Sequence, residues 1–208
     1  KSVVGPQLIV GYGLGHEIGQ PLAAQVRFRR QGGPLPFHKK LIGPVEAFRQ
    51  AGIHDIRVVL GHKADLLIPV LERLRVRAII NPHFSLGMYS SICAGVETME
   101  DEVKAFFVLP ADYPMVDRKT IITLISEYES GKHEVYYPTW KGKRGHPPLI
   151  SSRLRNVILD SRPQGGMEEL LESRAGDVLD VCVDDPGIIA DLDDREDYRL
   201  AAGKDFAD

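Results

Sequence analysis

A single carboxylate follows a continuous apolar run near the middle of the chain. Residues 105–109 carry no charge, Pro110 ends the run, and Asp112 comes two residues later. Such a run is typical of a strand buried on both faces, and ligands bind at the carboxyl ends of parallel strands. Because Mg²⁺ needs only one or two protein carboxylates, Asp112 is a candidate Mg²⁺ ligand. The alternative is that Asp112 opens a turn or caps the helix expected from Asp117.

Hydroxyl residues stand near the start of another expected helix. Asn81 ends a predicted strand, and Gly87 then precedes Ser90 and Ser91. Backbone N–H groups and hydroxyls at a helix start suit a nucleotide. An ordinary helix N-cap made by Ser90 or Ser91 is the alternative.

Glycines follow the first predicted strand. Residues 8–10 are apolar and lead into Gly11, Gly13 and Gly15. Glycines in this position let the backbone approach a phosphate closely. A dinucleotide fingerprint needs a glycine at its sixth position, and the sixth residue counted from Gly11 is His16. The segment is therefore a phosphate-loop candidate, with a glycine-rich turn as the alternative, and a dinucleotide-dependent oxidoreductase is disfavoured.

These residues would be positioned by an alternation of strands and helices. Strands are predicted at 3–10, 53–60, 76–80, 105–109, 135–138, 178–183 and 188–192, and helices at 44–52, 67–74, from about 87, from 117, at 156–159, 167–171 and 194–202. A basic hairpin-like turn is expected at 141–145. This alternation predicts an α/β fold, a three-layer Rossmann-like domain with a mostly parallel sheet. No repeat or linker is visible, so a single domain over residues 1–208 is expected.

Composition excludes several classes of protein. The chain has 208 residues, 43% hydrophobic and 26% charged, which is ordinary for a globular protein. A net charge of −3 gives no basic footprint for nucleic acid. No apolar run approaches the ~20 residues of a membrane span. Cys93 and Cys182 lie far apart and show no metal spacing. Since the N-terminus also lacks the charged-then-apolar pattern of a signal peptide, we expect free thiols in a reducing cytoplasm.

Five segments, taken together, resemble one known family. From about Val45 to Tyr198 the chain is similar to the MobA-like nucleotidyltransferases, in particular the molybdenum-cofactor cytidylyltransferase branch. The matching segments keep the family's order: 45–52 leading to 58–62; 81–82 with 87–91 and 94–95; 109–116; 144–147; and 191–193 with 196–198. The resemblance implies a glycosyltransferase-A-like nucleotidyltransferase fold.

The resemblance also implies roles for the residues. Asp112 and Asp191 would be the catalytic carboxylates, and Mg²⁺ would be held by Asp112 with Asp191 or Asp193. A phosphate oxygen of the second substrate would attack the α-phosphorus of the nucleotide and expel pyrophosphate. The nucleotide would bind at Asn81, Gly87, Ser90 and Ser91, and the acceptor at Gly145, His146 and Pro147. A packed or turn-stabilising histidine is the alternative for His146.

The N-terminus departs from the family, which opens with Leu-Ala-Ala-Gly-x-Ser-x-Arg-Met-Gly. Residues 9–19 match in length and contain Gly11 and Gly13, but Glu17 stands where the family has arginine. Residues 22–29 match the opening letters and keep Arg29, but lose the glycine and the serine. Gly11, Gly13 and Arg29 are therefore the candidate phosphate contacts.

The expected activity is transfer of a nucleoside monophosphate from CTP, or from GTP, to a phosphorylated acceptor such as molybdopterin, with a molybdoenzyme as a possible recipient of the product. A sugar- or alcohol-phosphate acceptor is one alternative. A nucleotide-binding module with impaired catalysis is another, because Glu17 would repel a triphosphate.

Overall fold

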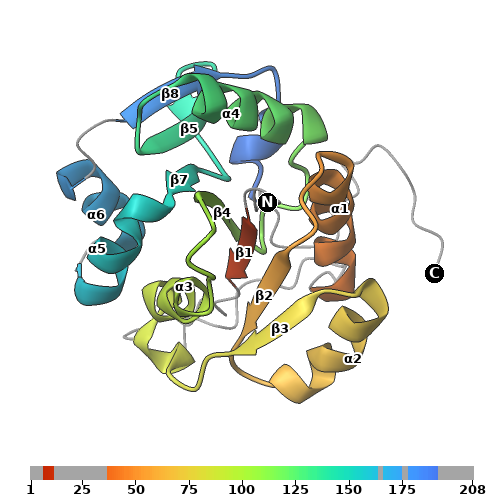
Figure 1. The fold of residues 1–208 in the computed structure, drawn as a ribbon. Coiled ribbons are helices and arrows are strands. Elements are labelled where there is room, and N and C mark those ends of the chain that lie inside the picture. Colours follow the sequence, from red (N-terminus) through yellow and green to blue (C-terminus); the bar gives the residue numbers. More distant parts are fainter. Residues whose placement is uncertain (1–6, 12–36, 164–165, 175–177, 192–208) are drawn as a thin grey trace, which may run out of the picture.

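The computed structural model describes residues 7–11, 37–163, 166–174 and 178–191 (Figure 1). Its strands are β1 (Gln7–Gly11), β2 (Ile56–Leu60), β3 (Arg77–Ile80), β4 (Ala105–Pro110), β5 (Val135–Trp140), β6 (Lys143–Arg144), β7 (Leu149–Ser151) and β8 (Val178–Cys182). Its helices are α1 (Phe37–Gln50), α2 (Ala64–Leu74), α3 (Met88–Glu97), α4 (Arg118–Ser130), α5 (Arg155–Asp160) and α6 (Gly166–Arg174), with 3-10 turns η2 (Phe84–Leu86), η3 (Ser152–Leu154) and η4 (Pro186–Ile189). The helix expected at 194–202 lies outside the described residues.

The strands form one mixed sheet. Their order is β3-β2-β1-β4-β7-β5-β6, and β8 pairs with β5. β1 pairs in parallel with β2 and β4, β2 with β3, and β5 with β8. β7 is inserted antiparallel between β4 and β5, and β5 forms a hairpin with β6. The α/β class is confirmed, and the sheet is parallel in the half built by β3, β2, β1 and β4.

Two apolar cores cover the two faces of the sheet. Alternate residues of β4 contribute to them: Phe107 and Leu109 pack with α1, α2 and α4, whereas Phe106 and Val108 pack with α3, α5 and α6. Figure 1 shows the same division, with α1, α2 and α4 on one side and α3, α5 and α6 on the other. β4 is buried along its whole length, as a strand covered on both faces must be.

The start of α1 differs from the prediction. The helix was expected to begin at Gly43-Pro44, but it begins at Phe37 and contains Pro44. Leu41, Val45 and Phe48 lie on one helical face and are fully buried. Of these three, Leu41 lies in the added turns. Its burial returns about 1.5–3 kcal/mol, which offsets much of the cost of about 3 kcal/mol for an interior proline.

In the C-terminal half one predicted strand is wrong and one observed strand was missed. The strand expected at 188–192 is wrong, because residues 186–189 form the 3-10 turn η4. Pro186 stands at its start and the Asp185 side chain accepts a hydrogen bond from Gly187 N, which is the chemistry of a cap. β7 was not expected, since its three residues are too short to show a period of two.

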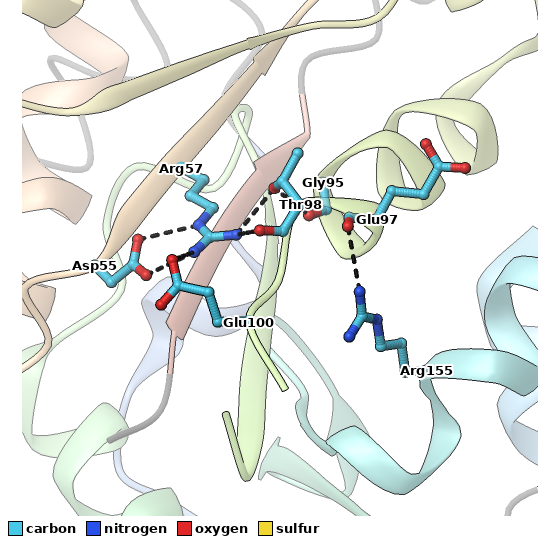
Figure 2. A network of polar contacts seen from close by, with 7 residues as sticks. All are labelled: Asp55, Arg57, Gly95, Glu97, Thr98, Glu100 and Arg155. Atoms are coloured by element: carbon cyan, nitrogen blue, oxygen red, sulfur yellow. Dashed lines mark hydrogen bonds and ion pairs between the residues drawn. The ribbon is translucent and has the colours of Figure 1, made fainter. Parts of the chain in front are cut away.

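A buried arginine joins the sheet to α3 (Figure 2). The Arg57 side chain on β2 is 0% exposed. It donates from Nε and Nη2 to the Asp55 carboxylate at 3.1 and 2.8 Å, and from Nη1 to the Thr98 hydroxyl at 3.0 Å and to the Thr98 carbonyl. Thr98 ends α3, so the guanidinium satisfies a terminal carbonyl and complements the helix dipole.

Replacing Arg57 with methionine is expected to lower the free energy of unfolding by about 2–4 kcal/mol, because it leaves the Asp55 carboxylate and the half-buried Thr98 carbonyl and hydroxyl without their donor. Urea denaturation measures the change. Arg155→Met is the matched control, since Arg155 pairs with Asp101, which is 96% exposed, and exposed pairs contribute about 0–1 kcal/mol. Equal losses in both variants would contradict the assignment.

Within the part of the chain that is described, no helix is both long and apolar enough to cross a membrane. Cys93 and Cys182 form no disulfide in the structure.

Candidate functional site

The carboxyl ends of β1 and β4 lie side by side. Gly11, the last residue of β1, pairs in register with Pro110, the last residue of β4. Asp112 follows two residues later and is half-buried. It is not the cap of the next helix: Asp117 caps α4, accepting a hydrogen bond from Lys119 N at 2.8 Å. Asp112 therefore stands at the edge of the sheet where parallel α/β folds bind ligands.

Tyr113 connects the two predicted carboxylates. Its pKa is raised from the ordinary value by burial, and further by the negative charges of Asp191 and Asp112. A charge acts on a neighbouring phenol through space and does not need to touch it. The charges of Asp191 and Asp112 thus both act on one phenol, although the two residues are far apart in the sequence, and their sharing of one cation stays a prediction. Asp193 lies outside the described residues.

The loop after β6 packs directly against η4. His146 N donates to the Ile188 carbonyl at 2.8 Å. A Cβ added to Gly145 would lie 2.3 Å from the same oxygen, so only glycine permits this approach. Since η4 leads directly to Asp191, the predicted acceptor residues Gly145 and His146 form one wall with the segment that carries the second carboxylate.

His146 is a neutral residue of this wall. Its ring centroid lies 4.5 Å from that of Tyr113, and its peptide bond to Pro147 is cis. Burial lowers the pKa of His146 to about 4. Its Nδ1 is buried and has no hydrogen-bond partner within the described residues, so nothing there stabilises the cation. At neutral pH the imidazole is an uncharged lining group.

Acid is expected to destabilise the protein through His146. An unfolded histidine titrates near 6.5, so between pH 6.5 and 4 the unfolded chain binds a proton that the folded chain does not. Stability is therefore complete above pH 6.5 and falls as the pH drops towards 4, by up to roughly 3 kcal/mol. Urea denaturation from pH 8 to 4.5 should show a shallower pH dependence for His146→Gln than for the unaltered chain. Parallel profiles would contradict this expectation.

A cavity of about 560 Å³ opens beside these residues. Its walls are mostly aromatic, aliphatic and thioether side chains, with Lys143, Arg144 and Glu168 as charged members. The other lining residues are Met88, Tyr89, Ile92, Val108, Pro110, Tyr113, Tyr137, Gly145, His146, Pro148, Gly166, Met167, Ile188 and Ile189. Gly145 and His146 line this cavity, and Pro148 lines it where Pro147 was expected. That the acceptor binds here stays a prediction.

One wall of the cavity is fixed by ionic contacts. Arg144 donates from Nε and Nη2 to the Asp180 carboxylate at 2.6 and 3.2 Å, and its guanidinium carbon lies 4.9 Å from the Tyr137 ring centroid. Burial, with the charge of Glu168 next, raises the pKa of Tyr137 to about 12. The phenol is therefore protonated at neutral pH and presents a flat, uncharged face.

The predicted nucleotide segment is held by Asn81. Its side chain is buried, with the residue 2% exposed, and donates from Nδ2 to the Ser90 and Ser91 hydroxyls at 2.9 and 3.1 Å. Its Oδ1 accepts from His83 N at 2.8 Å. The Ser90 hydroxyl in turn donates to the Gly87 carbonyl at 2.8 Å. Asn81 therefore fixes the shape of the loop between β3 and α3.

The alternative of a serine N-cap is wrong. Gly87 is the N-cap residue of α3, at φ 93°, and makes no side-chain cap. Ser90 and Ser91 lie inside the first turn and bond with Asn81 instead. The contact of these residues with a nucleotide stays a prediction, as does that of Gly11, while Gly13 and Arg29 lie outside the described residues.

The carboxylates suit a hard cation. Among the described residues no group of three or more His, Cys, Asp or Glu side chains is placed to hold a metal ion. Mg²⁺ needs only one or two protein carboxylates, because waters and substrate phosphates complete its octahedron. The oxygen ligands of Asp112 and Asp191 fit that requirement, and the metal role of both stays a prediction.

The model of the MobA-like NTP transferase domain matches residues 37–178, which is more than half of the chain. The chain belongs to this family. It is therefore a nucleotidyltransferase by family, and the MobA-like domain includes the Asp112 loop, Asn81 and His146. No curated protein sequence matches the chain.

Solved structures share the MobA-like fold at low identity. Rv0371c from Mycobacterium tuberculosis H37Rv is 17% identical with a TM-score of 0.70, covering 98% of this chain and 100% of that one. A 4-diphosphocytidyl-2C-methyl-D-erythritol synthase from Anaerococcus prevotii is 14% identical with a TM-score of 0.67, covering 96% and 94%. Molybdopterin-guanine dinucleotide biosynthesis protein A from Archaeoglobus fulgidus is 15% identical with a TM-score of 0.58, covering 95% and 96%. At these identities the likeness shows the fold alone.

Three side chains of this MobA-like site had no role assigned from the sequence. Tyr113 follows Asp112 directly, and this position next to a candidate metal ligand is the one feature of the sequence that points to it. Tyr137 lies in a predicted strand, where an aromatic residue is ordinary. Asp185 precedes Pro186-Gly187, which indicates a turn and nothing more.

Proposed function

We propose that this MobA-like protein transfers a nucleoside monophosphate from CTP, or from GTP, to a phosphorylated acceptor such as molybdopterin, and releases pyrophosphate. The observation that supports the proposal is that the charges of Asp112 and Asp191 both raise the pKa of Tyr113, which follows Asp112 after β4 and lines the cavity. Two carboxylates at this edge suit a divalent cation that binds nucleotide phosphates.

Asp112 and Asp191 would hold Mg²⁺, which when bound neutralises charge on the nucleotide phosphates. The Rv0371c protein, whose fold this chain shares, has a structure in complex with manganese, at 18% identity and a TM-score of 0.65 over 96% of this chain and 100% of that one. That complex supports a divalent cation in the proposal.

In this reaction no bond to the protein has to form or break. A phosphate oxygen of the acceptor forms a bond to the α-phosphorus, and the bond from that phosphorus to the bridging oxygen breaks as pyrophosphate leaves. The residues of this chain position the two substrates and exclude water. The neutral His146 ring lines the acceptor cavity without adding a charge to it.

The cavity favours a planar acceptor. Its volume of about 560 Å³ is in the range of ~300–1,000 Å³ usual for small-molecule sites. Tyr89, Tyr113 and Tyr137 offer flat aromatic faces, and Met88 and Met167 offer thioethers. Aromatic and thioether groups stack on a heterocycle such as a pterin, whereas a small polyol phosphate would leave these apolar walls in contact with water. The choice of molybdopterin first rests on this difference.

A sugar- or alcohol-phosphate acceptor is the second candidate. The observation that favours it is the fold shared with the 4-diphosphocytidyl-2C-methyl-D-erythritol synthase from Anaerococcus prevotii. Lys143, on the exposed strand β6, could meet an acceptor phosphate of either kind. Screening acceptors at fixed nucleotide concentration separates the two candidates.

Pyrophosphate release tests the proposal directly. The protein is incubated with CTP or GTP, Mg²⁺ and molybdopterin, and then with sugar phosphates or alditol phosphates in place of molybdopterin. Release that depends on both nucleotide and acceptor supports the proposal, and a higher rate with molybdopterin supports the planar acceptor. Release no faster than that of an Asp112→Ala variant contradicts it. The single domain over residues 1–208, the cytoplasmic location and a molybdoenzyme recipient belong to the same proposal.

A further inference from the structure

One buried carboxylate has no part in the proposed chemistry. Asp185, which is 6% exposed, lies between β8 and η4. Its Oδ2 accepts hydrogen bonds from Asp117 N at 2.9 Å and from the Thr120 hydroxyl at 2.7 Å. Its Oδ1 accepts a hydrogen bond from Gly187 N at 2.8 Å. Three donors thus compensate the burial of this side chain, which would otherwise be costly.

These donors belong to the two segments that carry the candidate metal ligands. Asp117 and Thr120 stand at the start of α4, at the end of the loop that begins with Asp112. Gly187 lies in η4, four residues before Asp191. The Asp185 carboxylate therefore links the loop after β4 to the segment that ends at Asp191.

The backbones of the two segments also touch. A Cβ added to Gly187 would lie 2.1 Å from the Met115 carbonyl oxygen, so the side chain of any other residue would push the segments apart. Asp185 bonds to one segment on each side of this contact. The close approach of the two segments is possible because Gly187 has no Cβ, and the hydrogen bonds of Asp185 stabilise it.

Asp117 provides a contrast within the same helix terminus. Its own carboxylate accepts from Lys119 N at 2.8 Å and so caps α4. This bond is local to one segment and does not reach η4. Both side chains stabilise the N-terminus of α4, but only that of Asp185 also bonds to the segment that delivers Asp191.

We propose that Asp185 is a positioning residue: by joining the start of α4 to η4 it holds Asp191 at the distance from Asp112 that a divalent cation requires. The inference rests on the proposed function, and it assigns a role to a residue that touches neither metal nor substrate. Groups that orient metal ligands in this way commonly change metal affinity by about 10–100-fold when they are replaced.

The test is Mn²⁺ binding, followed by electron paramagnetic resonance in the presence of CTP. Asp185→Asn keeps the size of the side chain, but its amide N–H₂ replaces one of the two accepting oxygens. It therefore faces donor groups that it cannot accept from. It is expected to weaken Mn²⁺ binding about tenfold or more, and to raise the metal concentration for half-maximal activity by the same factor. At saturating metal, kcat should return to within about threefold of the unaltered protein, because the ligands themselves are present.

Asp117→Asn is the matched control, since it also weakens the cap of α4. It should lower stability while Mn²⁺ affinity stays unchanged. Thr120→Val removes one bond to Asp185 and leaves the carboxylate in place, so it gives a smaller loss of affinity and supplies the test if Asp185→Asn does not fold.

The outcomes distinguish this inference from the proposed function. Weaker Mn²⁺ binding in Asp185→Asn and Thr120→Val, but not in Asp117→Asn, supports the positioning role. Equal Mn²⁺ affinity in all variants overturns that role and leaves the proposed function standing. An equal loss of affinity in Asp117→Asn also overturns it, because stability alone would then explain the effect. If the unaltered protein binds no Mn²⁺, the metal site of the proposed function fails and the positioning role fails with it.

Discussion

Replacing Asp112 with asparagine is expected to lower kcat/KM for nucleotidyl transfer by about 10²- to 10³-fold, the scale seen when one group that stabilises transition-state charge is removed. Asparagine keeps the volume and one oxygen of the side chain but loses the negative charge that a divalent cation needs. The fold should be little affected, because Asp112 is half-buried at a strand end and α4 is capped by Asp117. Initial rates of pyrophosphate release measure the effect.

The control for this prediction is Asp117→Asn in the same loop. It changes a carboxylate to an amide at the cap of α4, and we expect a loss of about 1 kcal/mol in stability with activity close to that of the unaltered protein. Urea denaturation of both variants shows whether lost activity is lost folding. If Asp112→Asn keeps its activity within about threefold of the unaltered protein, Asp112 is not a catalytic residue.

The parallel half of the sheet could be predicted because its strands carry their own signal. Residues 105–109 are buried on both faces, so they must be apolar throughout, and composition alone reveals them. β7 has no such signal. Its three residues form a strand only because β4 and β5 offer unpaired edges on either side, which is a property of the assembled sheet.

The same distinction applies to the site. Asp112 could be identified because the end of a buried strand is visible in the sequence. The role inferred for Asp185 depends on η4 packing against Met115, a contact between distant segments. The letters Asp185-Pro186-Gly187 indicate a turn in any protein, and the apolar pair that follows led to the wrong prediction of a strand. Interpretation from local pattern fails where tertiary contacts decide the conformation.

The serines show a third case. Ser90 and Ser91 at a helix start were compatible with an N-cap or with a nucleotide site. The structure excludes the cap, because Asn81 holds both hydroxyls. That contact joins the end of one strand to the next helix across the intervening loop, and hydroxyl residues alone do not specify which partner they choose.

Asp191→Asn provides the second large effect, and its combination with Asp112→Asn is the sharper experiment. If each carboxylate holds the same cation, either single substitution disables the metal site, and each should cost about 10²- to 10³-fold in kcat/KM. When two groups act as one unit, the effects of replacing them on kcat/KM are strongly non-additive. The double variant should therefore be no more than about tenfold slower than the slower single variant, whereas independent roles would multiply to about 10⁴-fold or more.

Tyr113 gives a second readout that does not depend on activity. The negative charges of Asp191 and Asp112 help to raise the pKa of the Tyr113 phenol, so removing either charge should lower that pKa. The ultraviolet titration of tyrosinate, taken as a difference from a Tyr113→Phe variant, measures it. Two results together would show that the carboxylates do not share a site: an unchanged pKa of Tyr113 in Asp191→Asn, and additive losses of kcat/KM in the double variant. Ligands of one cation lie close together and depend on each other, so both effects must appear if the site is shared.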